Sequence, residues 1–547
     1  MNSVQIVTLG AGAEVGRSCF LITVADTTVM VDAGIHLAPA RREDRVPKIP
    51  SDTKIAGVII THYHLDHIGS LPHLTEVEKS VDAECEIFMT APTRTLAIPV
   101  LLDYANGPNA DLFCPNHVWA CLTSPRVKQI SAGEEFRLKS NPHFIMHAVH
   151  AGHVVGGIML VIKYLGACII YTGDFSVVPD SLLNPIRIPR ELFVNADIVI
   201  TESTHATTVS NKSLLKIEED MCAKIKAAID RGGRVLIPVF AVGRTQELAA
   251  IIRSHLGEYV DLYTSSPAGQ KASIVSSNLH RQWLRSKSRL QVKILKENES
   301  FPPKSVLFAS PAMIEGGASL RHFIDICGDS KNMVLLTGYC SKETVGNSVI
   351  LFASRNVKDR TVTINRRKFL VNCECHYIPF SNHTDSIGII NVLKHCDPTC
   401  SVVLVHGQRD KMERFKTQLQ GMFNSSLRIE IPNNYEKLEF ILAKSKKNIP
   451  SLAEVCMKEY ALSFEVVMGT VREEFPHWVA NEGPNGTVIT EFRASLIVQR
   501  GNGVTSVSYV TKAELESDEW SKFNPMFHGL ERFLTAKYLD GISVCSA

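Results

Sequence analysis

Four potential metal ligands lie close together in the segment Thr61-His62-Tyr63-His64-Leu65-Asp66-His67. Burying three imidazoles and a carboxylate side by side is costly, because burial penalises their charged forms. A divalent cation removes that cost, and zinc accepts both imidazole nitrogen and carboxylate oxygen. In an extended turn, positions i and i+2 can face one metal, and positions i+4 and i+5 can turn to a second. The segment predicts a metal site; a chance group of histidines on a loop is the alternative.

Two metals need more ligands than this segment supplies. His153 follows a flexible glycine turn in Ala151-Gly152-His153-Val154-Val155-Gly156. Asp174 comes directly after an apolar run, at the end of a predicted strand, where a carboxylate can bridge two cations. Both are candidate ligands, although each taken alone is more often structural. Three further histidines crowd the same stretch: His143, His147 and His150.

Short β-prone strands precede and surround these residues. Apolar runs predict strands over Cys19–Val24, Thr28–Val31, Ala56–Thr61 and Glu86–Thr90, and a hairpin over Gly156–Tyr164 and Ala167–Thr172. Successive strands this close in the sequence favour antiparallel sheets packed on one another.

The pattern changes after the strand predicted over 197–202. Helical periodicity over 213–231 and 244–256 alternates with strands predicted over 235–240, 260–264, 306–310 and 334–339. Strand–helix alternation favours a mostly parallel, doubly wound sheet, so residues 207–375 are expected to form an α/β domain of their own. Strands return over His376–Phe380 and Val402–His406. Beyond a polar linker near 444–451, residues 451–547 are expected to form a small further domain.

The composition is that of an ordinary globular protein. The chain has 547 residues, 45% apolar and 21% charged, with a formal charge of +2, so a nucleic acid would have to be held by local basic surface. We find no apolar run long enough to cross a bilayer and no secretion signal at the N-terminus. The fourteen cysteines are therefore expected to be free thiols in an intracellular protein.

The HxHxDH run, the later histidine His153 and the later aspartate Asp174 resemble the metallo-β-lactamase superfamily. The early aspartate of that superfamily, which orients metal ligands, is matched by Asp32 in Met30-Val31-Asp32-Ala33-Gly34. Because the superfamily includes lactamases, thioesterases, lactonases and nucleases, the resemblance alone does not choose a substrate.

The spacing of the remaining motifs narrows the choice. The last histidine ligand of the superfamily is matched by His406, with a domain-sized interval between it and Asp174. This layout is similar to the β-CASP nucleases, whose acidic and histidine motifs are matched around Glu202 and His383. DNA-acting members usually lack the final histidine, so His406 favours RNA.

The resemblance is closer still to the eukaryotic RNA 3′-end-processing endonucleases of the cleavage and polyadenylation and Integrator complexes. It rests on residues 9–19, 231–244 and 338–340 and covers about residues 1–410. Residues 201–208 and 344–346 lean toward the Integrator type. The sequence departs from the family at Tyr63 (often Phe), Ile68 (often Cys), Asn382 (usually Ala) and residues 105–117.

The resemblance implies an α/β fold: a metallo-β-lactamase αββα sandwich interrupted by a β-CASP doubly wound domain and followed by a small α+β domain. The expected bounds are 1–206 and 376–445 for the two parts of the sandwich, 207–375 for the β-CASP domain and 451–547 for the C-terminal interaction domain.

The resemblance also implies a zinc-dependent endoribonuclease acting in pre-mRNA or small nuclear RNA 3′-end processing. Two zinc ions are expected, with the catalytic side chains Asp66, Glu202 and His383. His383 is the candidate general acid, held by Glu202. Arg244 is a candidate phosphate contact, with a capping or salt-bridge role as the alternative. The expected metal ligands are His62, His64, Asp66, His67, His153, Asp174 and His406.

Three other readings remain open at this stage. They are a small-molecule hydrolase, a catalytically silent scaffold subunit and a β-CASP exoribonuclease, since residues alone do not separate endo- from exonuclease. The expected partners are RNA, a non-catalytic paralogue bound through the C-terminal region and a larger processing complex, with no membrane. The expected location is the nucleus, with room for a cytoplasmic pool. The C-terminal aromatic residues Trp478, Trp520, Phe523 and Phe533 would serve the paralogue or an ordinary core.

Overall fold

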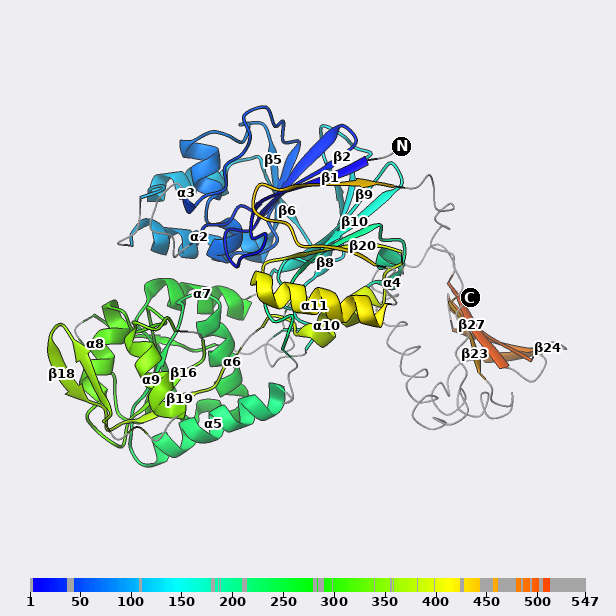
Figure 1. Cartoon of the computed structure of the whole chain (residues 1–547). Helices are drawn as coiled ribbons and strands as arrows, with labels where there is room; N and C mark the ends of the chain where they lie inside the picture. The colour runs from blue at the N-terminus through cyan, green and yellow to red at the C-terminus, as the bar shows by residue number, and fades with distance from the viewer. Residues whose placement is uncertain are drawn as a thin grey trace. The chain divides into compact units, whose positions relative to one another are not determined.

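A computed structural model describes residues 3–36, 44–107, 111–178, 188–208, 214–278 and 290–442, together with residues 183, 184, 186 and 283. Residues 298, 339, 355, 356, 358, 381, 398 and 424–426 are not described within those ranges, and beyond 442 only five strands are. The chain divides into two units, Met1–Lys444 and Ser445–Ala547 (Figure 1).

The first sheet of the larger unit has seven strands in the order β22-β1-β2-β3-β4-β5-β6. Strands β22, β1, β2 and β3 pair antiparallel, whereas β3 to β6 pair parallel. The strands are β1 Ser3–Gly10, β2 Cys19–Val24, β3 Thr27–Val31, β4 Gly57–Ile59, β5 Glu86–Thr90, β6 Val127–Ile130 and β22 Lys437–Ile441.

The second sheet also has seven strands, in the order β21-β20-β11-β10-β9-β8-β7. Strands β7 to β10 pair antiparallel, and β10, β11, β20 and β21 pair parallel. The expectation of antiparallel sheets is therefore wrong for half of each sheet, because long connections return the chain to the same end before the next strand begins. The strands are β7 Glu135–Arg137, β8 Ile145–His150, β9 Ile158–Tyr164, β10 Ala167–Tyr171, β11 Ile198–Glu202, β20 Ser401–Val405 and β21 Arg428–Glu430.

Alternation along β9 shows how the two sheets are layered. Ile158 and Leu160 belong to a core shared with the first sheet. Met159 and Val161 belong to a second core, which includes Phe415 of a covering helix. Successive strand residues face opposite sides of a sheet, so the sheets pack face to face with helices outside, in the expected αββα order. The helices are α1 Leu65–Ile68, η2 His73–Val77, α2 Ala91–Ala105, α3 Pro115–Thr123, α4 Arg190–Phe193, α10 Ser386–Leu393 and α11 Arg409–Met422.

The domain inserted between β11 and β20 is built on a six-stranded sheet, β14-β13-β15-β12-β16-β19, in which every pair is parallel. Its strands are β12 Val235–Pro238, β13 Asp261–Thr264, β14 Lys293–Ile294, β15 Ser305–Ala309, β16 Met333–Leu336 and β19 Glu374–Tyr377, with a hairpin of β17 Thr361–Ile364 and β18 Arg367–Leu370. The predicted doubly wound sheet is confirmed. The strand expected over His376–Phe380 corresponds to β19, which belongs to this sheet and spans the expected boundary at residue 375.

Helices cover both faces of the inserted sheet (green in Figure 1). Met221 and Leu248, from α5 and α6, share a core with Val235 and Ile237 of β12. Phe323 of α8 packs with Leu236 on the opposite face. The helices are α5 Leu214–Asp230, α6 Arg244–Leu256, η3 Gly257–Tyr259, α7 Pro267–Asn278, α8 Gly317–Ile326 and α9 Val345–Ser354.

The smaller unit contains a five-stranded antiparallel sheet in the order β23-β27-β26-β25-β24. Its strands are β23 Cys456–Tyr460, β24 Val479–Gly483, β25 Gly486–Glu491, β26 Ala494–Arg500 and β27 Thr505–Thr511. The four aromatic residues singled out above in this region lie outside the described residues.

Free thiols and the lack of a membrane-spanning segment were expected for the chain as a whole. The twelve cysteines described outside β23 are free thiols. Among the described residues, no helix combines the length and apolar character needed to cross a membrane.

Candidate metal centre

All seven expected metal ligands lie on segments that follow β-strands, five in loops and two in the short helix α1. The segment 62–67 follows β4 and enters α1, and His153 lies between β8 and β9. Asp174 follows β10, and His406 follows β20 directly. Five of the seven are almost completely buried, so they require polar partners of their own. These five are His62, His67, His153, Asp174 and His406.

One group of donor atoms is formed by three imidazoles and a carboxylate. His62 Nε2 lies 3.1 Å from His64 Nδ1, and His153 Nε2 lies 3.2 Å from the same atom. Asp174 Oδ2 is 3.8 Å from His62 Nε2 and 3.9 Å from His153 Nε2. One donor atom from each of the four residues lies within 4.8 Å of the others, which is the separation of ligands around a single cation.

A second group shares Asp174 with the first. His67 Nε2 lies 3.2 Å from Asp174 Oδ2, and His406 Nε2 lies 3.3 Å from Asp66 Oδ2. His406 Nδ1 is 3.5 Å from Asp174 Oδ1. The Oδ1 atom is buried and accepts no hydrogen bond from the described residues. A buried carboxylate oxygen in this state is costly unless a cation completes its surroundings, so Asp174 is placed to serve both groups.

Asp32 fixes the orientation of a histidine in the second group. Its Oδ2 lies 2.7 Å from His67 Nδ1 and accepts a hydrogen bond from the Tyr171 hydroxyl at 2.9 Å. Its Oδ1 accepts from the backbone N–H of Thr61 at 2.8 Å. By holding Nδ1, Asp32 aims the other ring nitrogen of His67 at Asp174. This matches the orienting position that the resemblance implies.

Two non-glycine residues at the centre have left-handed backbones. Asp32 has φ of 62° and His406 has φ of 52°, and such conformations cost about 1–3 kcal/mol each unless the surroundings hold them. The His406 N–H donates to the carbonyl of Ala11 at 2.8 Å, and the Asp32 N–H donates to that of Ile59 at 2.8 Å. Backbone strain of this kind concentrates at functional sites.

His153 is held by a residue that lies far away in the sequence. Its Nδ1–H donates to the carbonyl of Asn382 at 2.9 Å, which leaves Nε2 facing the first group. The Asn382 side chain donates back to the His153 carbonyl at 3.2 Å. The Asn382 side chain also approaches Glu247 of α6, where it favours the ionised carboxyl. Asn382, a departure from the family pattern, therefore links a candidate ligand to the inserted domain.

The protonation states of the first group suit metal binding, which requires neutral imidazoles. Burial, and then the neighbouring histidines, hold the pKa of His62 well below its usual value. Burial likewise lowers the pKa of His153 far below its usual value and that of His64 to about 4. In the second group, burial opposes the charged form of His67, but Asp174 and Asp32 raise its pKa well above normal. That proton would have to leave for a cation to bind.

A further pair lies against Asp174. His383 Nδ1 is 2.7 Å from Glu202 Oε2 and 3.8 Å from Asp174 Oδ2. Burial opposes a charged ring, but the carboxylates of Glu202 and Asp174 outweigh it and raise the pKa of His383 to about 9. Glu202 is fixed in turn by the Phe175 N–H at 2.8 Å and the Thr204 hydroxyl at 2.7 Å. The two carboxylates therefore favour the protonated ring of His383 beside the cluster.

Arg244 has the partners of a structural residue. Its guanidinium pairs with Glu247 at 2.5 Å and lies 5.8 Å from the centre of the Phe380 ring. The salt-bridge alternative is therefore present in the structure, and the N–H of Gly243, the residue before α6, donates to the Gln246 side chain. Residue reasoning had also missed the parts played by Tyr171, Thr204 and Asn382, for which the only signal was adjacency to a recognised motif.

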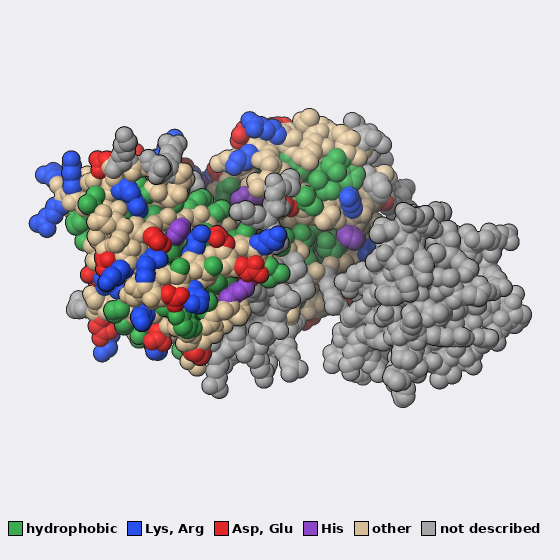
Figure 2. Space-filling view, turned by 90° about the horizontal axis from the view of Figure 1, so that it is seen from below, with side chains coloured by type: hydrophobic (Ala, Val, Ile, Leu, Met, Phe, Trp, Pro, Cys, Tyr) green, Lys and Arg blue, Asp and Glu red, His purple; other side chains and the backbone are tan. Residues whose placement is uncertain are grey.

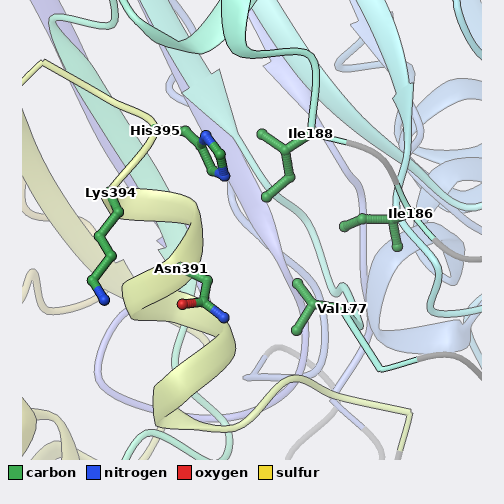
Figure 3. Close-up of a pocket in the computed structure, with 6 residues that line it drawn as sticks. All are labelled: Val177, Ile186, Ile188, Asn391, Lys394 and His395. Carbon is green, nitrogen blue, oxygen red and sulfur yellow. The ribbon is translucent and has the colours of Figure 1, made fainter. Parts of the chain in front are cut away.

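A separate groove of about 430 Å³ lies beside α10. Figure 3 shows His395 pointing toward Ile188 and Asn391 of that helix pointing toward Val177, with Ile186 beside them, whereas the Lys394 side chain runs along the helix. None of the residues that line this groove belongs to the His and Asp groups. The chemistry favours those groups as the functional centre.

Comparison with known proteins supports this choice of centre. Three family models match the chain: the metallo-beta-lactamase superfamily over residues 12–225, the Beta-Casp domain over 245–349, and the Zn-dependent metallo-hydrolase RNA specificity domain over 370–431. A solved structure of a protein of unknown function from Enterococcus faecalis V583 shares the fold, with a TM-score of 0.52 over 80% of this chain and 100% of that chain, at 10% identity.

Named relatives resemble the chain over most of its length. It is 32% identical to Integrator complex subunit 11 of Gallus gallus over 455 residues, 78% of this chain and 72% of that protein. It is 30% identical to Cleavage and polyadenylation specificity factor 73 of Drosophila melanogaster over 522 residues, 91% and 73% of the two chains. It is 28% identical to Endoribonuclease YSH1 of Mycosarcoma maydis over 539 residues, 93% and 59%.

The chain spans 58% of the Integrator complex subunit 11 homolog of Dictyostelium discoideum, to which it is 32% identical over 442 residues. Sequence motifs, the interrupted sandwich and these likenesses agree with one another. The chain belongs to the metallo-β-lactamase proteins with an inserted β-CASP domain, in the family that contains Integrator complex subunit 11 and cleavage and polyadenylation specificity factor 73.

Proposed function

We propose that this protein is a zinc-dependent endoribonuclease of RNA 3′-end processing, acting on pre-mRNA or small nuclear RNA. The observation that carries the proposal is Asp174, which shares donor groups with the histidines on one side and with the Glu202–His383 pair on the other. A relative bears the name endoribonuclease, and the β-CASP domain separates the chain from small-molecule hydrolases of the same superfamily.

We assign the metal ligands by the two donor groups. His62, His64 and His153 would hold one zinc, Asp66, His67 and His406 the other, and Asp174 would bridge them. Nitrogen and carboxylate oxygen are the donors that zinc accepts. When bound, two such ions supply an activated water at neutral pH and stabilise charge on the phosphate.

His383 is assigned as the general acid for the leaving 3′-oxygen of the ribose. The Glu202 carboxylate accepts from Nδ1 at 2.7 Å, so the proton for the leaving oxygen would come from Nε2. Glu202 also favours the charged ring, which keeps a proton on His383 at neutral pH. The products would carry a 3′-hydroxyl and a 5′-phosphate.

A silent scaffold subunit is the second candidate, because the relatives are named as subunits of complexes. Paralogues of that kind lose metal ligands, whereas all seven candidates are present here and lie in two donor groups. The proposal includes a nuclear location and a larger RNA-processing complex. It also includes pairing with a non-catalytic paralogue through residues 451–547.

Metal content and cleavage distinguish the two candidates. We expect about two zinc ions per chain by mass spectrometry of the native protein, and cleavage of single-stranded RNA that a chelator abolishes and added zinc restores. Ends carrying a 5′-phosphate and internal cuts in a circular RNA would establish an endonuclease. A chain that binds no metal would be a scaffold, and cutting confined to linear RNA ends would indicate the exonuclease alternative.

A further inference from the structure

One large aromatic side chain stands out in the loop that links β12 to α6. Phe240 is 59% exposed, although its neighbours Val239, Ala241 and Val242 are 1%, 8% and 8% exposed. A phenyl ring gains nothing by facing water, and its surroundings offer ample apolar core. The loop therefore buries three of its side chains and presents the fourth.

The backbone of this loop is fixed on both sides of Phe240. The Val239 N–H donates to the Ala309 carbonyl at 2.9 Å. The Thr245 hydroxyl donates to the Phe240 carbonyl at 3.2 Å, and the Gln246 side chain donates to the Ala241 carbonyl at 3.4 Å. A ring held on an anchored loop loses little conformational entropy when a ligand packs on it.

The loop ends at the metal centre. A Cβ built on Gly243 would lie 3.2 Å from Tyr63 Oη and 3.5 Å from His64 Nε2. Three residues of chain span at most about 11 Å, so the Phe240 backbone lies within that distance of Gly243. The loop leaves β12 at its carboxyl end, the edge of a parallel sheet where ligands usually bind.

Among the described residues, the cation next to this loop is already engaged within the protein. The nearby guanidinium of Arg244 is already paired with Glu247. On the one face shown in Figure 2, the described Lys and Arg side chains are interspersed with Asp and Glu. Single-stranded nucleic acids are held by basic grooves and by bases stacked on aromatic rings, and the second means is the one present at this loop.

From this geometry we infer that Phe240 is a stacking platform for one base of a single-stranded RNA, beside the phosphate that is cut. This inference rests on the proposed function and adds a substrate contact to it. A phenyl ring has no polar atom and therefore forms no hydrogen bond that could identify a base. The platform accepts any base, and its affinity depends on how strongly that base stacks.

The test pairs a change in the protein with a change in the RNA. The probe is a short single-stranded RNA that the zinc-loaded protein cuts, prepared with an abasic ribose at one position at a time. We expect an abasic site at one position near the cut to raise KM about tenfold with wild type, the size of one base–aromatic stack. With Phe240→Ala, the intact RNA should show that rise, and the abasic RNA should show no further loss.

Two other variants separate stacking from simple apolar contact and from folding. Phe240→Trp should restore the wild-type KM, whereas Phe240→Leu should not. Tyr259→Ala removes an aromatic ring that is 55% exposed. Tyr259 lies in η3, just before β13, and so at the opposite end of the strands from Phe240. Its replacement should leave KM unchanged. Equal KM for wild type and Phe240→Ala, in a protein that cuts RNA, overturns the platform and leaves the nuclease intact. If wild type cuts no RNA, the proposed function itself is at fault.

Discussion

His383 and Glu202 come from distant segments, yet they form a contact of 2.7 Å at the edge of the metal groups. If His383 supplies the proton for the leaving oxygen, His383→Ala should lower kcat by about 10²–10⁴ at neutral pH. It is not an assigned ligand, so metal content should remain that of wild type. Turnover of RNA and zinc content of the same preparation are the two measurements.

A second histidine–carboxylate pair gives the control. His376 lies 3.4 Å from Glu374 on β19, outside the donor groups. His376→Ala should leave kcat within twofold or so of wild type. Wild-type turnover by His383→Ala would remove that residue from the chemistry, and loss of zinc would make it a ligand instead.

Asn382 offers a test of how the inserted domain supports the centre. Asn382→Ala restores the residue usual in the family but removes the hydrogen bond from its side chain to the His153 carbonyl and its contact with Glu247. Because the hydrogen bond to the His153 carbonyl is buried, we expect a loss of about 1–3 kcal/mol in the free energy of unfolding. The bond from His153 Nδ1 goes to the backbone of Asn382, so zinc content should be kept.

Asn372→Ala is the matched surface change. Its side chain also donates to a carbonyl, that of Gly328 at 3.1 Å, but the residue is exposed. Denaturant unfolding should place this variant within about 0.5 kcal/mol of wild type. An Asn382→Ala protein that is as stable as Asn372→Ala would show that the contacts of the Asn382 side chain contribute nothing to the free energy of unfolding.

At the scale of single residues, the sequence predicted the spacing of the candidate ligands but not the contacts that hold them in place. The four candidate ligands of the 62–67 segment were expected from their positions in one short turn, and His406 from the family layout. The partners of those ligands did not follow, because Tyr171 and Asn382 carry no special spacing and reach the centre only through folding. Asp32 was the exception, since the family places an aspartate at that point.

Among the elements, the end of β8 carries a histidine whose protonation should oppose folding. Burial alone lowers the pKa of His150 to about 4. Its Nδ1 accepts the Gly152 N–H at 3.1 Å, and its ring lies 5.0 Å from that of Trp283. The folded state therefore keeps the ring neutral between pH 4 and the unfolded pKa of about 6.5.

In that window the unfolded chain binds the extra proton, so stability falls as the pH falls. We expect wild type to lose about 1 kcal/mol per pH unit between pH 6 and 4.5 relative to His150→Gln. Glutamine keeps an acceptor near the Gly152 N–H and never takes a proton. Urea unfolding of both proteins at several pH values measures the difference, and parallel curves would show that His150 is protonated equally in both states.

Strand positions were predictable where apolar runs are short and bounded, but strand directions were not. The runs over 56–61 and 86–90 match β4 and β5, which pair parallel. Direction depends on whether the connection returns to the same end of the sheet. For β4 and β5 that connection holds α1 and η2, which hydrophobic periodicity over so few residues does not reveal. In the inserted domain the helices are long, and there the parallel sheet was predicted correctly.

For the whole molecule, the chain interrupts one sandwich with a second domain and returns to finish it. The finishing strand is β22, which pairs with β1 along the edge of the first sheet. Its residues Leu438 and Phe440 are 8% and 3% exposed and belong to the main core. The second part of the sandwich is therefore needed to complete the first. The two parts form one domain, although they are separated in the sequence.

This arrangement predicts where the chain can be shortened. A protein of residues 1–444 keeps β22 and all three described cores, so it should fold cooperatively and bind as much zinc as the full chain. A protein of residues 1–432 lacks β22, which uncovers the edge of β1 and the apolar side chains beneath it. An exposed β edge invites association between chains, so the shorter protein should aggregate or unfold at a lower temperature.

Size-exclusion chromatography, thermal unfolding and zinc analysis compare the two lengths. Equal behaviour of both would mean that β22 is dispensable, and failure of 1–444 alone would mean that the smaller unit supports the larger one.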